Sequence, residues 1–188
     1  MPATRYPGGV TVTIRPARTG DAAALASVAA VTFPLACPPH TTEEAKAHFI
    51  ATVLSPERFA EYVTDPSRRV LIAEDETGEA IGYTMVIVGE PADEDVRRAI
   101  RVRPTAELSK CYVLPGHHGE GVAGRLMVAS VSAAADAGAE GMWLGVNEEN
   151  ARAQRFYGKH GFEHVGSKRF LVGERWEDDW VMERSPIS

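Results

Sequence analysis

The 188-residue sequence predicts one α/β domain in which helices cover the faces of a mixed sheet. Two observations carry this prediction. Strand-like and helix-like segments alternate along the chain, and one strand leads into a helix through a glycine-rich turn at 117–121. The composition, 44% hydrophobic and 24% charged, is ordinary for a globular chain of this length. No repeat or linker divides residues 10–188, and residues 1–9 are expected to form a flexible tail.

The N-terminal part is predicted to begin with a strand and a helix. Residues Val10–Arg15 alternate apolar and polar side chains, which is the period of a half-buried strand. Asp21 is expected to act as the N-cap of an alanine-rich helix that runs to about Val31. Pro34 is expected to break the chain soon afterwards.

Two more helices are expected before the next strand. Thr41 and Thr42, followed by two glutamates, start a helix that extends toward Leu54. A short third helix begins at Ser55-Pro56, because proline is favoured at the first helical position, and it ends at Asp65-Pro66.

The middle of the chain is predicted to form a hairpin and a further strand. Segments 69–74 and 80–88 are apolar and flank the turn Asp75–Gly78, which favours a hairpin. Residues 90–103 are polar and of mixed charge, so a loop or a surface helix is expected there. Residues 106–114 form the next strand, which Pro115 ends.

The C-terminal part is predicted to alternate between helix and strand. A helix from about Val122 to Ala137 follows the glycine-rich turn, and a buried strand covers 142–146. Residues 150–160 form a helix that Gly161 caps, and a terminal pair of strands begins at Phe162.

Charge and cysteine content exclude several classes of protein. The net charge of −6 argues against a nucleic-acid partner, because nucleic-acid backbones are polyanionic. The two cysteines, Cys37 and Cys111, are too few and too far apart in sequence for a disulfide framework or a cysteine-rich zinc site, and no metal site is expected. No apolar run is expected to reach the roughly 18–20 residues of a membrane span, and the N-terminus lacks the pattern of a signal peptide. A cytoplasmic protein without a membrane partner is therefore expected.

The glycine-rich segment 118–124 could hold an anion. Glycines allow main-chain N–H groups to approach a pyrophosphate closely, and the N-terminus of the following helix contributes partial positive charge. A tight turn without a ligand is the alternative. A P-loop is disfavoured because no Lys-Ser or Lys-Thr follows these glycines. A Rossmann fingerprint is disfavoured because no repeated βαβ unit follows.

Two motifs resemble the GNAT superfamily of N-acetyltransferases. Tyr112-Val-Leu-Pro-Gly-His-His-Gly-Glu-Gly-Val-Ala123 is similar to the family's coenzyme A loop, Q/R-x-x-G-x-G/A, with His118 in the Q/R position. Asn150-Ala-Arg-Ala-Gln-Arg-Phe-Tyr157-Gly-Lys-His-Gly161-Phe162 matches N-x-x-A-x-x-[FL]-Y-x-x-x-G-F. Similarity extends over about residues 10–182 and is sharp over 106–162. Within it, the C-terminal half is similar to bacterial polyamine N-acetyltransferases of the spermidine/spermine type.

This resemblance implies a GNAT fold with a mixed, mostly antiparallel sheet of six to seven strands and helices on both faces. It implies an acetyl-CoA-dependent N-acetyltransferase, with acetyl-CoA as co-substrate and a homodimer as a common arrangement. The residues that it assigns to the coenzyme are Cys111, Tyr112, Val113, His118, Gly119, Glu120, Gly121, Val122, Ala123, Gly124, Asn150 and Tyr157. Main-chain groups at 111–113 would hold the pantetheine arm, with the Val113 N–H group directed at the thioester oxygen.

Two side chains are candidates for proton transfer. Asn150, Ala153 and Tyr157 share one helical face by their spacing, and the resemblance assigns the Tyr157 hydroxyl to the departing sulfur. Glu107 lies six residues before Val113, an even number that predicts the same strand face, and it is the candidate base. A relaying water is the alternative base, and an exposed glutamate at a strand start is the alternative role for Glu107.

The acceptor is expected to be the primary amine of a small molecule, with a polyamine as one candidate. Glu43, Glu44, Asp178 and Asp179 could receive a polycation. The same acids are also typical of helix starts and solvated surfaces. A protein lysine or N-terminus is an alternative acceptor, and a module that binds acyl-CoA without turnover is a different class of function.

Overall fold

The computed structural model describes residues 11–117, 121–172 and 175–187. Their strands form a seven-stranded sheet in the order β1-β2-β3-β4-β5-β7-β6. In chain order the strands are β1 (Thr13–Pro16), β2 (Arg68–Glu74), β3 (Ala80–Val88), β4 (Thr105–Val113), β5 (Gly141–Asn147), β6 (Glu163–Val172) and β7 (Arg175–Arg184). β4 and β5 are parallel, whereas the pairs β1–β2, β5–β7 and β6–β7 are antiparallel. A mixed, mostly antiparallel sheet is therefore confirmed.

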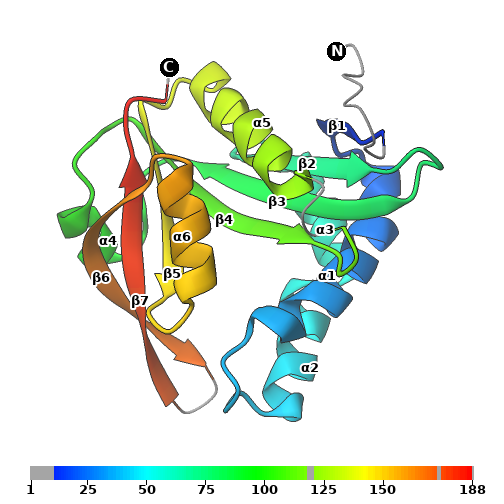
Figure 1. Cartoon of the computed structure of the whole chain (residues 1–188), viewed down its shortest axis with the longest axis horizontal. Helices are drawn as coiled ribbons and strands as arrows, with labels where there is room; N and C mark the ends of the chain where they lie inside the picture. Colours follow the sequence, from blue (N-terminus) through cyan, green and yellow to red (C-terminus); the bar gives the residue numbers. More distant parts are fainter. Residues whose placement is uncertain (1–10, 118–120, 173–174, 188) are drawn as a thin grey trace. The chain divides into compact units, whose positions relative to one another are not determined.

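Helices occupy the connections between these strands (Figure 1). In chain order they are α1 (Ala22–Ala36), preceded by the 3-10 turn η1 (Thr19–Asp21), α2 (Glu43–Val53), α3 (Pro56–Thr64), α4 (Glu94–Ala99), α5 (Val122–Asp136) and α6 (Ala151–Lys159). Every predicted helix is found, and the polar segment 90–103 contains the short helix α4.

The chain forms two compact units, which are described separately. The first contains residues 11–85 and 110–130, and the second contains residues 86–109 and 131–187. Strands β3 and β4 each contribute to both. The single domain over 10–188 stays a prediction, and the tail expected at residues 1–9 lies outside the described residues.

Neighbouring residues of β3 show how helices cover both faces of the sheet in the first unit. The Tyr83 ring meets the edge of Phe59 in α3, with 5.3 Å between ring centroids. The next side chain, Thr84, accepts a hydrogen bond of 2.8 Å from Ser130 Oγ in α5. Successive residues of a strand point to opposite faces, so α3 and α5 lie on opposite sides of β3 (Figure 1).

Helix α1 differs from the sequence prediction at both ends. Asp21 does not cap α1 through its side chain. Its carboxylate instead accepts from the Arg18 N–H at 2.7 Å and from the Arg15 guanidinium, which also pairs with Glu74. The helix passes through Pro34 and ends at Ala36. Because Pro34 lies in the last turn, its missing N–H group costs one hydrogen bond near an end that frays.

Within the described residues, one segment is long and apolar enough to cross a membrane by length and composition. This segment, Thr19–Ala36, has 18 residues with a mean hydropathy of 1.3. The expectation that no run of this kind occurs is therefore wrong. Leu25, Val28 and Ala29 of this segment are at most 3% exposed, so part of it lies in the core of the first unit.

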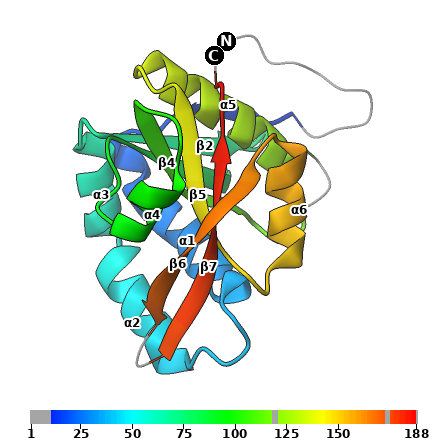
Figure 2. The same ribbon diagram turned by 90° about the vertical axis from the view of Figure 1, so that its left-hand side faces the viewer.

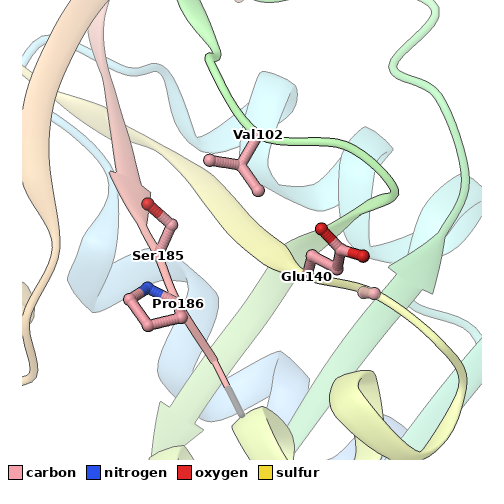
Figure 3. A pocket seen from close by; sticks show the side chains of 5 residues that line it. Val102, Glu140, Ser185 and Pro186 are labelled. Atoms are coloured by element: carbon pink, nitrogen blue, oxygen red, sulfur yellow. The ribbon is translucent and has the colours of Figure 1, made fainter.

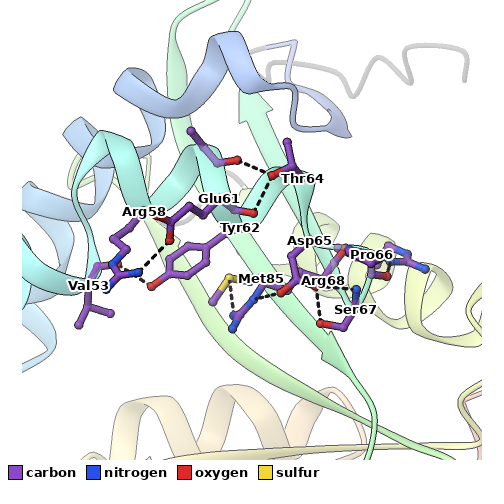
Figure 4. Close-up of polar contacts among 12 residues, drawn as sticks. Val53, Arg58, Glu61, Tyr62, Thr64, Asp65, Pro66, Ser67, Arg68 and Met85 are labelled. Carbon is purple, nitrogen blue, oxygen red and sulfur yellow. Dashed lines mark hydrogen bonds and ion pairs between the residues drawn. The ribbon is translucent and has the colours of Figure 1, made fainter.

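Local capping signals determine α2 and α3. Thr42 accepts from the Ala45 N–H and Ser55 from the Arg58 N–H, as the sequence predicts. After α3 the chain turns at Asp65, whose carboxylate accepts from the Arg68 guanidinium at 3.0 Å (Figure 4). These interactions join the end of α3 to the start of β2.

The second unit is built on β5 and β7. On one face, Trp143 and Val181 pack with Val96 and Ile100 from the α4 region. On the other face lies α6, so that α4 and α6 stand on either side of β5 and β7 (Figure 2). Gly166 of β6 permits this packing, because a Cβ there would lie 2.6 Å from the Ala99 Cβ.

Candidate active site

Glu107 is the third residue of β4 and is half-buried. It lies directly opposite Trp143 of β5, at the last of the three parallel pairs that join β4 to β5. Opposed residues share a face of the sheet, so Glu107 is on the side of the Trp143 ring. Glu107 belongs to the second unit and Val113 to the first. Their location on a common strand face therefore stays a prediction.

The three residues expected to hold the pantetheine arm end β4. Val113 is 9% exposed and packs with Val122 and Leu126 of α5. The Tyr112 ring lies 5.8 Å from that of Tyr83, and burial raises the pKa of Tyr112 to about 12. Burial also raises the pKa of the Cys111 thiol to about 12. A thiol that stays protonated favours packing over nucleophilic chemistry at this cysteine.

The coenzyme loop is described only from Gly121 onward. His118, Gly119 and Glu120 lie outside the described residues. Gly121 has a φ of +75°, a conformation that favours glycine, and its carbonyl accepts from the Arg125 N–H at 3.0 Å. Val122 is buried, whereas Ala123 and Gly124 are half-buried in the first turn of α5. The main-chain N–H groups in the first turn of any helix lack helical partners, which is what a bound phosphate requires.

Helix α6 carries the second motif and begins soon after β5. The Asn150 side chain is the N-cap and accepts from the Ala153 N–H at 3.0 Å. The carboxamide oxygen makes this bond, and the Nδ2 group carries two further N–H donors. Tyr157 is half-buried, and its ring lies 6.0 Å from Phe162 and 5.5 Å from Phe156. These aromatic contacts orient the Tyr157 ring on α6.

The structure also places polar residues in the β5–α6 turn that sequence reasoning missed. Gln154 Nε2 donates to the carbonyl oxygens of Asn147 and Glu148. Asn147 Oδ1 accepts from the Glu149 N–H at 2.9 Å, and Asn147 Nδ2 donates over 3.5 Å to Glu177. Gln154 occupies a variable position of the motif, so nothing in the sequence predicted a role for it. Asn147 and Glu177 are 30 residues apart in the chain, and only strand pairing brings them together.

The acidic residues proposed for the acceptor fall into different settings. In the first unit, Glu44 is exposed, and Glu43 is 86% exposed and pairs with Lys46 at 2.8 Å in the first turn of α2. In the second unit, Asp178 is exposed and lies 3.9 Å from Arg169.

Asp179 is the one of these four acids that lies in a sheltered setting. It is half-buried in β7 of the second unit. Burial is the main cause that raises the pKa of its carboxyl group, and the Lys168 charge opposes this effect. Burial disfavours the charged form of this carboxyl group, and a cation placed beside it would stabilise that form.

Asp179 belongs to a polar row on one face of the second unit. It lies opposite Asn147 of β5 and Lys168 of β6, and Glu177 is two positions away on the same face of β7. Glu177 is 8% exposed. At Gly145, an added Cβ would lie 2.6 Å from Lys168 Cε and 3.4 Å from Asp179 Oδ2. The absence of a side chain at Gly145 therefore leaves space for the Lys168 and Asp179 side chains.

A surface hollow of about 520 Å³ lies elsewhere in the second unit and is lined by Val102, Ala139, Glu140, Ser185 and Pro186 (Figure 3). It adjoins the start of β5, whereas α6 follows the end of that strand. The five lining residues lie outside α6. Ser185 follows Arg184, whose guanidinium donates to the His160 carbonyl oxygen at the C-terminal end of α6. Among the described residues, no three His, Cys, Asp or Glu side chains are grouped to hold a metal ion.

Comparison with known proteins identifies the family. Residues 33–162 match the acetyltransferase (GNAT) family, which is more than half of the chain. The chain belongs to the GNAT family of acetyltransferases. This acetyltransferase is 50% identical over 167 residues to uncharacterized N-acetyltransferases of Mycobacterium tuberculosis and Mycobacterium bovis, covering 89% of this chain and 99% of theirs. The enzyme is thus an N-acetyltransferase, and its co-substrate is acetyl-CoA.

Solved structures share the fold of this acetyltransferase. The PaiA N-acetyltransferase of Thermoplasma acidophilum, solved with coenzyme A, has a TM-score of 0.73 and 19% identity, covering 93% of this chain and 99% of that one. A chimera of the spermidine N-acetyltransferase SpeG from Vibrio cholerae has a TM-score of 0.65 and 20% identity, covering 93% and 95%. The GNAT fold predicted from the two motifs is therefore confirmed.

Proposed function

We propose that this acetyltransferase transfers an acetyl group from acetyl-CoA directly to the primary amine of a small molecule. The observation that carries the proposal is the arrangement of α6. Asn150 caps the helix, and Tyr157 follows two turns later with its ring held by Phe156 and Phe162. The family motif assigns the proton donor for the departing thiolate to this tyrosine.

The proposed reaction needs two proton transfers. The amine nitrogen attacks the thioester carbonyl carbon, a C–N bond forms and the C–S bond breaks. The thiolate takes a proton from the Tyr157 hydroxyl, and the amine gives one to Glu107, either directly or through a water. Main-chain N–H donation from Val113 would stabilise the charge on the carbonyl oxygen.

We place coenzyme A along the end of β4 and the start of α5. Main-chain groups of Cys111–Val113 would bind the pantetheine arm, and the resemblance assigns the Asn150 side chain to it as well. The pyrophosphate would meet residues 118–124, of which Gly121 has a positive φ and Val122–Gly124 form the first turn of α5. The coenzyme complex of the structurally similar PaiA enzyme supports a coenzyme A site in this fold.

A cationic acceptor is supported by the polar row that contains Asp179 and Glu177. Burial and the neighbouring Glu177 and Asp178 charges raise the pKa of Asp179, so a nearby ammonium group would favour its charged form. A polyamine fits this chemistry, and the fold likeness to the spermidine N-acetyltransferase SpeG agrees with it. Glu43 and Glu44 are not needed, since they stand in the first turn of α2, where acids favour the helix start.

Other assignments are alternatives for experiment. A protein lysine or N-terminus would replace the small amine as acceptor, and a non-catalytic module would bind acyl-CoA without turnover. We also propose a cytoplasmic location and a homodimer, with no nucleic-acid or membrane partner.

One experiment tests the proposal in two steps. Acetyl-CoA is titrated in a thermal-shift assay, where binding to the folded state must raise Tm. Free thiol release is then measured with polyamines, amino acids, aminoglycosides and lysine peptides. We expect turnover with a polyamine to exceed turnover with peptides. No thermal shift at millimolar acetyl-CoA would refute coenzyme binding, and preference for a lysine peptide would refute the small-molecule acceptor.

A further inference from the structure

The Gln154 side chain spans the junction between β5 and α6. Gln154 lies on α6, one turn before Tyr157, and is half-buried. Its Nε2 group donates at 3.1 Å to the Asn147 carbonyl oxygen and at 2.9 Å to the Glu148 carbonyl oxygen. The carboxamide thereby uses both of its N–H donors on the main chain that leaves β5.

The main chain that receives Gln154 is itself held in place. The Asn147 carbonyl also accepts from the Asn150 N–H at 3.0 Å, and the Glu148 N–H donates to the Asp178 carbonyl of β7 at 3.1 Å. The Asn147 side chain accepts from the Glu149 N–H. Gln154 thus joins α6 to a turn that is fixed against the sheet.

We propose that Gln154 is a positioning residue that sets the place of the Tyr157 hydroxyl. The inference rests on the proposed function, since it acts through the proposed proton donor. Asn150 caps the first turn of α6 by accepting from the Ala153 N–H, but this bond is local to the helix. The two Gln154 hydrogen bonds, formed one turn later, attach the helix to the end of β5 and so fix its rotation.

Few side chains can replace Gln154 in this role. Glutamate has the same length but presents acceptors to two carbonyl oxygens, so Gln154→Glu removes both hydrogen bonds and adds repulsion. Gln154→Ala removes the bonds without repulsion. Arg155→Ala is the matched control, because Arg155 is exposed on the same helix and neighbours Gln154.

The decisive test is a double-mutant cycle on kcat with saturating acetyl-CoA and the best amine from the screen. We expect Gln154→Ala to lower kcat about tenfold and Gln154→Glu to lower it further, with KM for acetyl-CoA changed less than about threefold. In a Tyr157→Phe background, the same Gln154 substitutions should lower kcat less than about twofold, because the group they position is gone. Arg155→Ala should leave kcat within about twofold of the parent value.

A purely structural role predicts a different pattern. If Gln154→Ala lowers kcat equally with and without the Tyr157 hydroxyl, or does not lower it at all, the positioning role is wrong. Thermal unfolding of each variant identifies any that fail to fold, and Gln154→Met then supplies a donor-free side chain of similar length. Turnover by the unmodified enzyme is measured in the same assay, so loss of the positioning role is distinguishable from failure of the proposed function. A Tyr157→Phe enzyme with full activity would overturn both the acid assignment and this inference.

Discussion

Replacing Gly82 with alanine adds a methyl group to β3 where the first unit has no room for one. The added Cβ would lie 2.9 Å from the Tyr112 carbonyl oxygen and 3.2 Å from both Leu126 Cδ1 and Val113 Cγ2. The nearest obstacle is main chain, which cannot rotate away as a side chain could. Overpacking of this kind costs about 1–3 kcal/mol. We therefore expect Gly82→Ala to lower the free energy of unfolding by that amount.

Urea denaturation measures this effect as a lower midpoint with an unchanged m-value. Gly158→Ala is the matched control, because an added Cβ there meets no atom within 4 Å. It lies within α6, where alanine is favoured over glycine by roughly 0.5–1 kcal/mol, so the control should be more stable than the parent protein. Equal stability of Gly82→Ala and the parent would show that β3 and β4 separate easily, contrary to the packing described. Because Tyr112 adjoins the proposed thioester site, we also expect a raised KM for acetyl-CoA.

Four further outcomes are expected. Tyr157→Phe should lower kcat about a hundredfold with little change in KM, measured by thiol release; a change of only about twofold would remove the acid assignment. Ser130→Ala should lower the free energy of unfolding by about 1–3 kcal/mol, because the buried Thr84 hydroxyl loses its partner. Adding Thr84→Val to this variant should restore part of the lost stability, measured by urea denaturation. The Arg15 hydrogen bond lowers the pKa of Asp21 to about 2. The ionised carboxylate therefore adds about 1–2 kcal/mol to the free energy of unfolding above about pH 4, and this is lost as pH falls from about 4 to 2. Asp21→Asn should make the free energy of unfolding depend less on pH in this range. The Cys111 thiol, whose pKa burial raises to about 12, should resist alkylation at about pH 8 until urea unfolds the protein, and rapid alkylation of the folded protein would contradict the raised pKa.

Local sequence signals predicted much of the fold. Thr42 and Ser55 cap α2 and α3, because a short side-chain oxygen at a helix start satisfies the nearby N–H groups whatever the tertiary structure. Two motifs, at 112–123 and 150–162, were enough to indicate the family. The roles of Glu107, Tyr157 and the coenzyme residues stay predictions for the experiments above.

Tertiary structure decided what depends on residues far apart in the chain. Asp21 was expected to cap α1 but instead pairs with Arg15, which also reaches Glu74, because β1 and β2 lie side by side. The contact of Glu177 with Asn147 likewise requires β7 to pair with β5. By itself, the sequence determined the helices and strands, the caps of α2 and α3, and the family, since these follow from neighbouring residues. Strand order and the polar contacts around α6 required the folded chain, because they join groups that no local pattern relates.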